Sequence, residues 1–415
     1  MAAFESLDLS SPPRRGRPVE RFESCCGGYS EQVPEFPYSR LRRRPDVEAE
    51  NLQAYDATDL LLVERALALA AERGITGAQI AVIGDEYGAL TLASTAAGFR
   101  GIRVHQDLAT GRRALARNAA ELGIDGFVAH ELDAGLLTDA RLVLLQLPKA
   151  LAELEEIADA VARWAAPDAV VVAGGRVKHM TIAQNEVLGR SFGVVQAQRA
   201  ERKSRLIVAS EPRAVPEHPP FPVAATHDGL TLIAHGGAFA GTKLDIGTRV
   251  LLEVLGALRL ASLAQEPRKG PTILDLGCGT GALAVSYALA HPDARVVATD
   301  RSAAAVASAR ATVIANGVAD RVTVTHDDAA SEVPDASVDV VLLNPPFHLG
   351  TSIHAGAATR LFDASARVLR PDGELFTVFN SSLGYRAELA RLIGPTEQLH
   401  RTPKFTVTRS IRRPR

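Results

Sequence analysis

The two halves of the chain repeat one series of motifs, and this repeat constrains the fold more than any other feature of the sequence. The spacing that separates Gly84 from Gly277 also carries Asp107 onto Asp300. The matched segments, in chain order, are 83–90 with 276–283, Asp107 with Asp300, 144–149 with 342–347, and 167–168 with 371–372. Four matches in the same order indicate an internal duplication.

Each half alternates short β-branched runs with longer stretches rich in Ala, Leu and Arg. This alternation is typical of a parallel sheet with helices on both faces. In the second half we predict strands at 272–276, 295–299, 322–325, 338–343 and 374–378. A chain of 415 residues also exceeds one comfortable core. The expected fold class is therefore α/β, with two tandem doubly wound Rossmann-like domains.

Two stretches of unusual composition set the expected domain limits. Residues 1–45 are rich in Pro, Arg, Ser and Gly and show no apolar periodicity, which predicts a mobile tail. Five prolines fall within 211–222, where they interrupt helix and strand alike. We therefore expect one domain over 46–212 and a second over 213–415.

Composition and charge limit the compartment and the partners. No apolar run has transmembrane length, and no apolar stretch follows the N-terminal arginines as it would in a signal peptide. Three cysteines, two of them the adjacent Cys25 and Cys26, have the spacing of neither a disulfide framework nor a zinc site. We expect a cytoplasmic protein with no metal and no membrane association. With a net charge of −2, any binding to nucleic acid must rest on local patches.

A glycine-rich turn in the second half predicts a cofactor site. The run Leu-Asp-Leu-Gly-Cys-Gly-Thr-Gly at 274–281 closes a strand and opens a helix, and its glycines allow a close approach to a ligand. Acidic residues lie before the turn and after the next two strands, which suits a cationic sulfonium cofactor and would repel a pyrophosphate. The candidate residues for S-adenosylmethionine are Asp275, Gly277, Cys278, Gly279, Asp300, Asp327 and Asp328. The alternative is a nucleotide-binding or purely structural glycine turn.

The sequence Asn344, Pro345, Pro346, Phe347 is the candidate catalytic motif. It follows an apolar strand and therefore projects from the carboxyl edge of the sheet, where open α/β sheets bind ligands. The Asn344 side-chain oxygen and the Pro345 carbonyl can accept the two hydrogens of an amino group whose lone pair is otherwise delocalised. Phe347 offers a flat face for a base, and the prolines stiffen the loop. His348 is a further candidate that could assist by hydrogen bonding, and the alternative is a purely structural role.

Several segments resemble one family. Residues 272–350 resemble class I methyltransferases, and Asn344 to His348 resembles the ribosomal RNA guanine-N2 methyltransferases in particular. The flanking segments 237–239, 244–248 and 404–405 also look like segments of that family, and in the first half 52–55, 87–90 and 148–149 look closer to the large-subunit (23S) enzymes than to the small-subunit (16S) ones. The resemblance implies a degenerate domain joined to an active one, guanine N2 as acceptor, and a cytoplasmic enzyme.

The first half departs from the second where chemistry is expected. Asp85, Glu86 and Tyr87 stand where the second half has Cys278, Gly279 and Thr280, so side chains fill the turn and we expect no cofactor there. This half either braces the active domain or docks RNA through phosphate contacts. The candidate basic residues are Lys149, Arg176, Lys178, Arg199, Arg202, Lys203 and Arg205.

The sequence thus predicts an S-adenosylmethionine-dependent methyltransferase that forms N2-methylguanosine in ribosomal RNA, with 23S rRNA as the expected substrate. We expect a monomer that acts on rRNA, free or in a ribosomal subunit or its precursor. The alternatives are a 16S rRNA guanine-N2 enzyme, an adenine-N6 or protein glutamine-N5 methyltransferase, and a non-catalytic RNA-binding or assembly factor.

Overall fold

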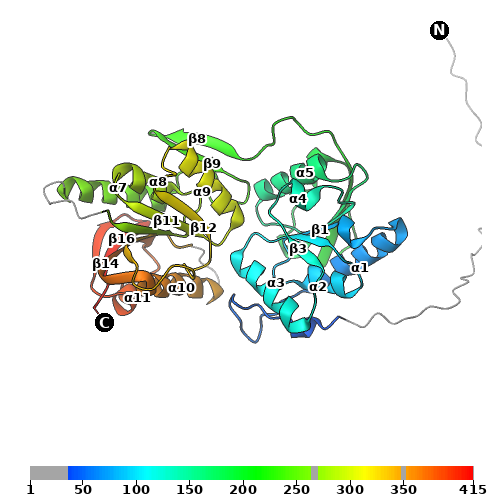
Figure 1. The fold of residues 1–415 in the computed structure, drawn as a ribbon, viewed down its shortest axis with the longest axis horizontal. Helices are drawn as coiled ribbons and strands as arrows, with labels where there is room; N and C mark the ends of the chain where they lie inside the picture. The colour runs from blue at the N-terminus through cyan, green and yellow to red at the C-terminus, as the bar shows by residue number, and fades with distance from the viewer. Residues whose placement is uncertain (1–35, 263–269, 347–351, 415) are drawn as a thin grey trace, which may run out of the picture. The chain divides into compact units, whose positions relative to one another are not determined.

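Two seven-stranded sheets with the same strand order form the protein. The structure is a computed structural model that describes residues 36–262, 270–346 and 352–414. The strand orders are β3-β2-β1-β4-β5-β7-β6 in the first half and β12-β11-β10-β13-β14-β16-β15 in the second. Helices cover both faces of each sheet (Figure 1). The predicted pair of doubly wound α/β folds is confirmed.

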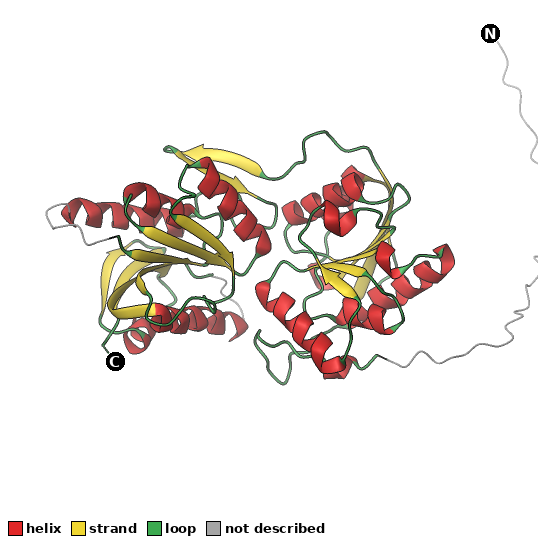
Figure 2. Cartoon of the chain, viewed as in Figure 1, coloured by secondary structure: helices red, strands yellow, loops and turns green. Residues whose placement is uncertain are grey.

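The strands and helices of the two halves follow each other in the same order, except that the short α4 between β3 and β4 has no counterpart between β12 and β13 (Figure 2). Those of the first half are α1 (Ala57–Arg73), β1 (Ile80–Ile83), α2 (Ala89–Ala96), β2 (Ile102–His105), α3 (Ala109–Leu122), β3 (Phe127–Ala129), α4 (Ala134–Leu137), β4 (Leu142–Gln146), α5 (Leu151–Trp164), β5 (Val170–Arg176), α6 (Ile182–Ser191), β6 (Phe192–Ala197) and β7 (Ser204–Pro212). Those of the second half are α7 (Ile246–Ser262), β10 (Thr272–Leu276), α8 (Ala282–Ala290), β11 (Arg295–Asp300), α9 (Ala303–Ala315), β12 (Val322–His326), β13 (Val338–Leu343), α10 (Ser352–Val368), β14 (Leu369–Asn380), α11 (Arg386–Leu392), β15 (Thr396–Arg401) and β16 (Phe405–Ile411). Short 3-10 helices lie at Tyr38–Arg40, Gly77–Gln79 and Val177–His179.

The register of the strands shows that the duplication seen in the sequence is also present in the structure. In the first sheet Ile83 of β1 lies opposite Leu145 of β4, and in the second Leu276 of β10 lies opposite Leu343 of β13. The residues that follow, Gln146 and Asn344, therefore occupy equivalent places at the carboxyl edges of the two sheets. Side chains at these places have the same backbone setting, so differences between them reflect chemistry and not position.

The strand next to one edge of each sheet, β7 in the first and β16 in the second, runs against the others. β7 pairs antiparallel with β5 and β6, and β16 pairs antiparallel with β14 and β15. The parallel pattern expected from the sequence is therefore wrong at this edge. The physical reason is local: β6 and β7 are joined by a short turn, with Arg202 and Lys203 at φ of 49° and 62°, and need no crossover helix.

Alternating strand residues divide the core of each half into two layers. Ile80 and Val82 of β1 pack under α1, α2 and α3, whereas Ile83 faces α4, α5 and α6. In the second half Ile273 of β10 packs with α7, α8 and α9, and Leu274 packs with α10 and α11. A strand buried on both faces is apolar at every position, which is why these runs do not alternate with polar residues.

Two further segments lie outside the sheets. The hairpin of β8 (Val223–His227) and β9 (Leu230–Ala234) packs along α9, where the Ile233 amide donates to the Thr312 hydroxyl at 2.9 Å. Residues 213–222 join β7 to β8, and we propose that the domain boundary lies there. Residues 36–45, assigned to the tail in the sequence analysis, pack on the first half through Leu41, which is 4% exposed.

Candidate active site

The glycine turn after β10 is open on one side. The Gly277 and Cys278 amides donate to the Thr299 carbonyl at 2.8 and 3.0 Å, which ties the turn to β11. Gly277 and Gly279 have φ of 78° and 54°, a conformation that side chains disfavour. No heavy atom lies within 4 Å of where a Cβ would stand at either glycine. The turn therefore leaves space for a ligand at the end of the strand, whereas the Cys278 side chain is buried away from it.

Asp300 ends β11 beside that space. One of its carboxylate oxygens accepts from the Gly279 amide at 2.9 Å and the other from the Ser302 amide at 2.9 Å. These two bonds fix the plane of the carboxylate and leave acceptor capacity on both oxygens. Burial raises the pKa of Asp300, and the two backbone amides act in the opposite direction. This fixed carboxylate can accept hydrogen bonds from two vicinal hydroxyls of a ligand.

Asp275 is buried below the turn with half of its carboxylate unused. Its Oδ2 accepts from the Ala284 amide at 2.9 Å in the first turn of α8, while its Oδ1 has no partner within the described ranges. Burial raises the pKa of Asp275 to about 7, and the neighbouring Asp300 adds to the rise. An unpaired buried carboxylate oxygen favours a cationic donor, such as the amine of an amino-acid moiety.

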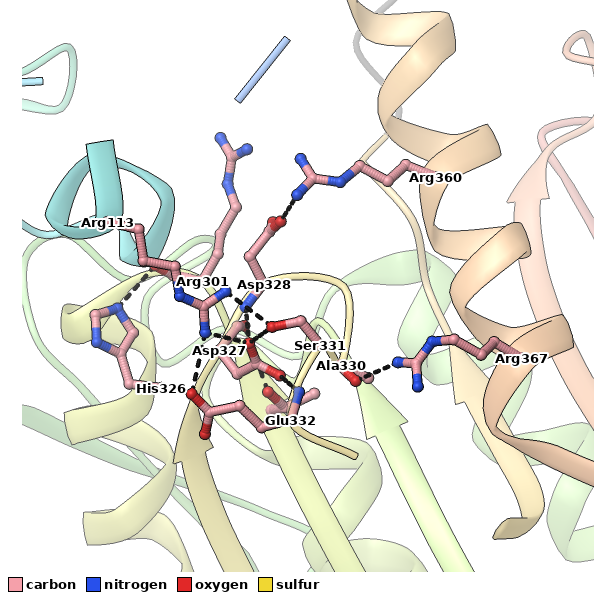
Figure 3. A network of polar contacts seen from close by, with 11 residues as sticks. Arg113, Arg301, His326, Asp327, Asp328, Ala330, Ser331, Glu332, Arg360 and Arg367 are labelled. Atoms are coloured by element: carbon pink, nitrogen blue, oxygen red, sulfur yellow. Dashed lines mark hydrogen bonds and ion pairs between the residues drawn. The ribbon is translucent and has the colours of Figure 1, made fainter. Parts of the chain in front are cut away.

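The carboxylate of Asp327, after β12, is already fully engaged. It accepts from the Arg113 guanidinium and the Ser331 hydroxyl at 2.8 and 2.5 Å, and from the Glu332 amide at 2.9 Å. Burial alone would raise its pKa, but these three donors outweigh burial and lower it. Figure 3 shows Arg113 reaching from α3 into this cluster. The neighbouring Asp328 pairs with Arg360 of α10 through one oxygen and keeps the other.

Asn344 directly follows β13, at the same edge of the sheet. Its side-chain NH2 group donates to Asp245 at 3.0 Å and to the Thr248 hydroxyl at 2.9 Å. Its Oδ1 is buried and has no hydrogen-bond partner in the part of the chain that the structure describes. Pro345 is buried and Pro346 is exposed. Phe347 and His348, named with them in the sequence analysis, lie outside the described residues.

In the first half, side chains fill the equivalent turn. The Asp85 carboxylate is fully buried and accepts from the Gly88 and Thr91 amides at 3.0 and 2.8 Å. The Tyr87 ring lies in the core, and its hydroxyl donates to Asp46 at 2.9 Å. Asp85 thus supplies to α2 the cap that Asp275 supplies to α8 from the strand below.

The counterpart of Asp300 in the first half has a different task. Asp107 accepts from the Ser302 hydroxyl and the Ala304 amide at 3.1 and 2.9 Å, at the start of α9 in the second half. Its carbonyl also accepts from the Ala303 amide at 2.9 Å. A residue of the degenerate copy therefore caps the helix that begins three residues after Asp300.

Some of the basic residues proposed for RNA contact lie near acidic side chains, and others are exposed. Register places Arg176 of β5 opposite Ser204 of β7, so Lys203 and Arg205 lie beside it at one end of the sheet. Within that end Arg202 pairs with Glu64 at 2.9 Å and Arg176 approaches Asp56 at 3.8 Å. Four of the candidates are exposed and form no ion pair with another described residue: Lys149, Lys178, Arg199 and Lys203.

Sequence reasoning missed the residues that hold the site from outside the motifs. Asp245 and Thr248 appear in the sequence analysis only as part of a family-like segment, although an acidic residue just before a helix with apolar periodicity is a visible N-cap signal. Arg113 has no such signal, because its partner Asp327 is distant in the chain. Of the described residues, no group of three or more His, Cys, Asp or Glu is arranged to hold a metal ion.

Known proteins with this arrangement match the chain over most of its length. The family model of the methyltransferase small domain matches residues 229–409, and that of the RLMG N-terminal domain matches 32–213. The ribosomal RNA large subunit methyltransferase G of Streptomyces coelicolor is 34% identical over 389 residues, which covers 90% of this chain and 97% of the relative. The chain belongs to the ribosomal RNA large subunit methyltransferase G family. It is an S-adenosylmethionine-dependent methyltransferase.

Two further matches agree with the family and with the fold respectively. The enzyme of the same name from Pseudomonas aeruginosa is 36% identical over 385 residues and covers 90% of this chain and 98% of its own. Among solved structures, the 16S rRNA N2 methyltransferase of T. thermophilus, bound to AdoMet and guanosine, aligns with a TM-score of 0.65 at 23% identity. It covers 80% of this chain and 88% of its own, and at that identity it supports the fold alone. No helix in the described ranges has the length and apolar character that crossing a membrane requires.

Proposed function

We propose that this protein transfers a methyl group from S-adenosylmethionine to the exocyclic N2 of guanine in large-subunit (23S) ribosomal RNA. The observation that carries the proposal is the unpartnered, buried Oδ1 of Asn344 at the same sheet edge as the open turn of Gly277 and Gly279. An acceptor is thereby held where an amino group can be brought to a cofactor. The names of the relatives supply the substrate class.

The residues around the turn fit S-adenosylmethionine. Asp300 offers acceptor capacity for the two ribose hydroxyls, and the unpaired Oδ1 of Asp275 suits the amine. Gly277, Gly279 and the Cys278 backbone leave space for the ligand chain. At the adenine end Asp328 keeps an oxygen free, whereas Asp327 is occupied by Arg113 and its neighbours. When bound, the cofactor supplies an electrophilic methyl group.

Asn344 and Pro345 orient the acceptor amine. An amino group conjugated to guanine is a poor nucleophile, because its lone pair is delocalised into the ring. Two acceptors, the Asn344 Oδ1 and the Pro345 carbonyl, hold its two hydrogens and turn the lone pair toward the methyl donor. Pro346 lacks an amide hydrogen and stiffens the loop, and Phe347 is proposed to stack on the base. The surplus proton leaves after transfer, so no separate general base is needed.

The first half is proposed to hold the RNA. Lys149, Lys178, Arg199 and Lys203 are exposed, and two of them flank the carboxyl end of β5. Arg202 and Arg205 belong to the same group but face acidic or buried surroundings. Cations in this position neutralise phosphates without reading sequence, which suits a large structured RNA. We propose action in the cytoplasm, on free rRNA or on a ribosomal subunit or its precursor.

The test is nucleoside analysis of rRNA methylated by the purified protein, followed by mapping of the modified guanine. The expected result is N2-methylguanosine in large-subunit rRNA, lost from cells that lack the gene. Methylation confined to 16S rRNA would move the substrate to the small subunit. N6-methyladenosine, or methylation of protein glutamine alone, would overturn guanine N2. Absence of any product together with RNA binding would indicate a non-catalytic assembly factor.

A further inference from the structure

Asn344 is held in one of its two possible amide orientations. A side-chain amide presents an acceptor on one side and a donor on the other. Here the Nδ2 group donates to both Asp245 and Thr248, at 3.0 and 2.9 Å. A carboxylate accepts and never donates, so of the two ends of the Asn344 amide only the nitrogen can bond to Asp245. The Oδ1 is consequently the atom left without a partner in the described part of the chain.

Orientation decides whether Asn344 can serve an amino group. With the amide turned over, Nδ2 would point at the amine and two donors would face each other. The Asn344 Nδ2 would then lose its acceptors Asp245 and Thr248. Its N–H groups would instead attract the lone pair of the target nitrogen and turn that lone pair away from the methyl group. A charged acceptor such as Asp245 makes a hydrogen bond about twice as strong as a neutral one, which disfavours the turned-over state.

Gly247 allows the amide to come this close to α7. A Cβ built at Gly247 would stand 3.0 Å from the Asp245 carboxylate and 3.2 Å from the Asn344 Oδ1. It would also stand 3.4 Å from the ring of Phe405. A side chain at position 247 would therefore crowd all three groups, which would have to shift by a few tenths of an ångström to admit it. Glycine at this position is compatible with the close contact between Asn344 and the start of α7.

We infer that Asp245, with Thr248, is a positioning residue that fixes the Asn344 amide with its oxygen toward the acceptor nitrogen. The inference rests on the proposed function of Asn344 and extends it to α7. Asp245 also caps this helix, since it accepts from the Thr248 amide at 3.2 Å. Both bonds go to Oδ2 of Asp245, and a shorter N-cap side chain such as Ser separates the two tasks, because Ser still caps a helix.

The first half contains an equivalent hydrogen bond between a residue at the end of a strand and the preceding helix. Gln146, at the place of Asn344, donates its side-chain NH2 to Asp59 in the first turn of α1. The tie between the strand-end amide and the preceding helix is thus common to both copies. Only in the second half does it leave an orphaned oxygen, the Oδ1 of Asn344, beside an open glycine turn.

The first experiment separates positioning from capping. Asp245→Ser keeps a good N-cap residue but is too short to reach Asn344. We expect kcat to fall by roughly 10- to 100-fold, with the affinity for S-adenosylmethionine within about twofold and the unfolding midpoint nearly unchanged. Thr248→Val removes the second acceptor at constant shape and should give a smaller loss of kcat. An unchanged kcat in Asp245→Ser would overturn the inference.

The second experiment exchanges the partners. Asn344→Asp alone places two carboxylates together and should lose activity at neutral pH. In the double variant Asp245→Asn with Asn344→Asp, the new amide donates to the new carboxylate, whose other oxygen remains an acceptor. We expect the double variant to recover at least about tenfold in kcat over Asn344→Asp, a coupling that a merely structural residue would not show. Absence of recovery would count against the inference, whereas an active Asn344→Ala would instead refute the proposed function.

Discussion

Arg113 of α3 and Asp327 beyond β12 form an ion pair at 2.8 Å, with the Asp327 side chain buried and the Arg113 side chain about a third exposed. The two residues belong to different copies of the duplicated fold. Arg301 and Asp328 lie next to them at the cofactor edge (Figure 3). The degenerate copy therefore supplies the cation that balances a buried carboxylate of the active copy, in addition to the cap that Asp107 gives to α9. The first half thus braces the active half through these two contacts.

Removal of Arg113 should disturb the cofactor edge. In Arg113→Ala the buried Asp327 loses its only charged partner from α3, which should destabilise the protein by about 1–3 kcal/mol and weaken S-adenosylmethionine binding several-fold. Thermal unfolding and calorimetric titration measure the two effects. Arg117→Ala, at an exposed arginine of the same helix, is the matched control and should change neither.

The pH dependence of the same variant gives a second check. Because the pKa of Asp327 is lowered in the folded state, its contribution to stability is present above its unfolded pKa of about 4 and is lost as the pH falls through the folded value. The difference between wild type and Arg113→Ala should therefore shrink in acid. A difference that grows below pH 4 would contradict the ion pair.

Asp300 should carry much of the cofactor affinity. Asp300→Ala removes an acceptor held in place by the Gly279 and Ser302 amides, and we expect S-adenosylmethionine binding to weaken by about 2–4 kcal/mol. Calorimetry at fixed pH measures the change. Unchanged affinity would remove Asp300 from the cofactor site, whereas unfolding of the variant would be recognised by its thermal melting curve.

Cofactor binding should release a proton through Asp275. With its pKa raised to about 7 by burial, Asp275 is largely protonated below that pH in the free protein. A cationic amine beside Oδ1 would favour the ionised form, so binding should expel a proton between about pH 5 and 7. Titrations in two buffers of different ionisation enthalpy measure the release. Asp275→Asn should abolish it, and a wild-type protein that releases no proton would separate Asp275 from the amine.

The repeat in the sequence predicted the fold well, and for a physical reason. Strands buried on both faces are mostly apolar, so 338–343, in which Asp339 is the only polar residue, was predicted with the bounds of β13. Individual strands were predicted for the second half only, and β15 and β16 were not among them, because the pairing of an antiparallel strand depends on a turn and a neighbour that local pattern does not specify. The predicted strand at 374–378 is the middle of β14, whose ends run on to Leu369 and Asn380.

The sequence predicted only those residues of the site that belong to a short motif. The glycine turn, Asp300 and Asn344 were found because their spacing is local to one strand and its loop. The tie from Asn344 to Asp245 and the pair of Arg113 with Asp327 join segments far apart in the chain. Such contacts arise from the packing of one element on another, so the residue types alone did not indicate them.

Charge reversal at the end of the first sheet should weaken RNA binding. Lys178→Glu with Lys203→Glu removes two exposed cations near β5, and the slope of log affinity against log salt should become less steep by about 1–2. Methylation of a small guanine-containing substrate should persist, since the site lies in the other half. Each single reversal, Lys178→Glu or Lys203→Glu, has Arg117→Glu as a control with the same change of charge. An unchanged salt slope would assign both lysines to solvated surface.

Replacement of Asn344 tests the amino-group chemistry itself. Its Oδ1 is proposed to act on the acceptor nitrogen and not on cofactor binding, because the cofactor residues belong to other elements: Gly279 follows β10 and Asp300 ends β11. Asn344→Ala should therefore lower kcat by on the order of 100-fold or more, while the affinity for S-adenosylmethionine stays within a few-fold. Phe347→Ala should differ, weakening productive capture of the base by about 1–3 kcal/mol through lost stacking, and Phe347→Tyr should retain much of the activity because the ring face survives. Rapid-quench turnover with rRNA, alongside cofactor titration, distinguishes these patterns. A loss of cofactor affinity equal to the loss of kcat in Asn344→Ala would show that Asn344 supports the cofactor pocket, and the alignment of the guanine amine would then have to come from other groups.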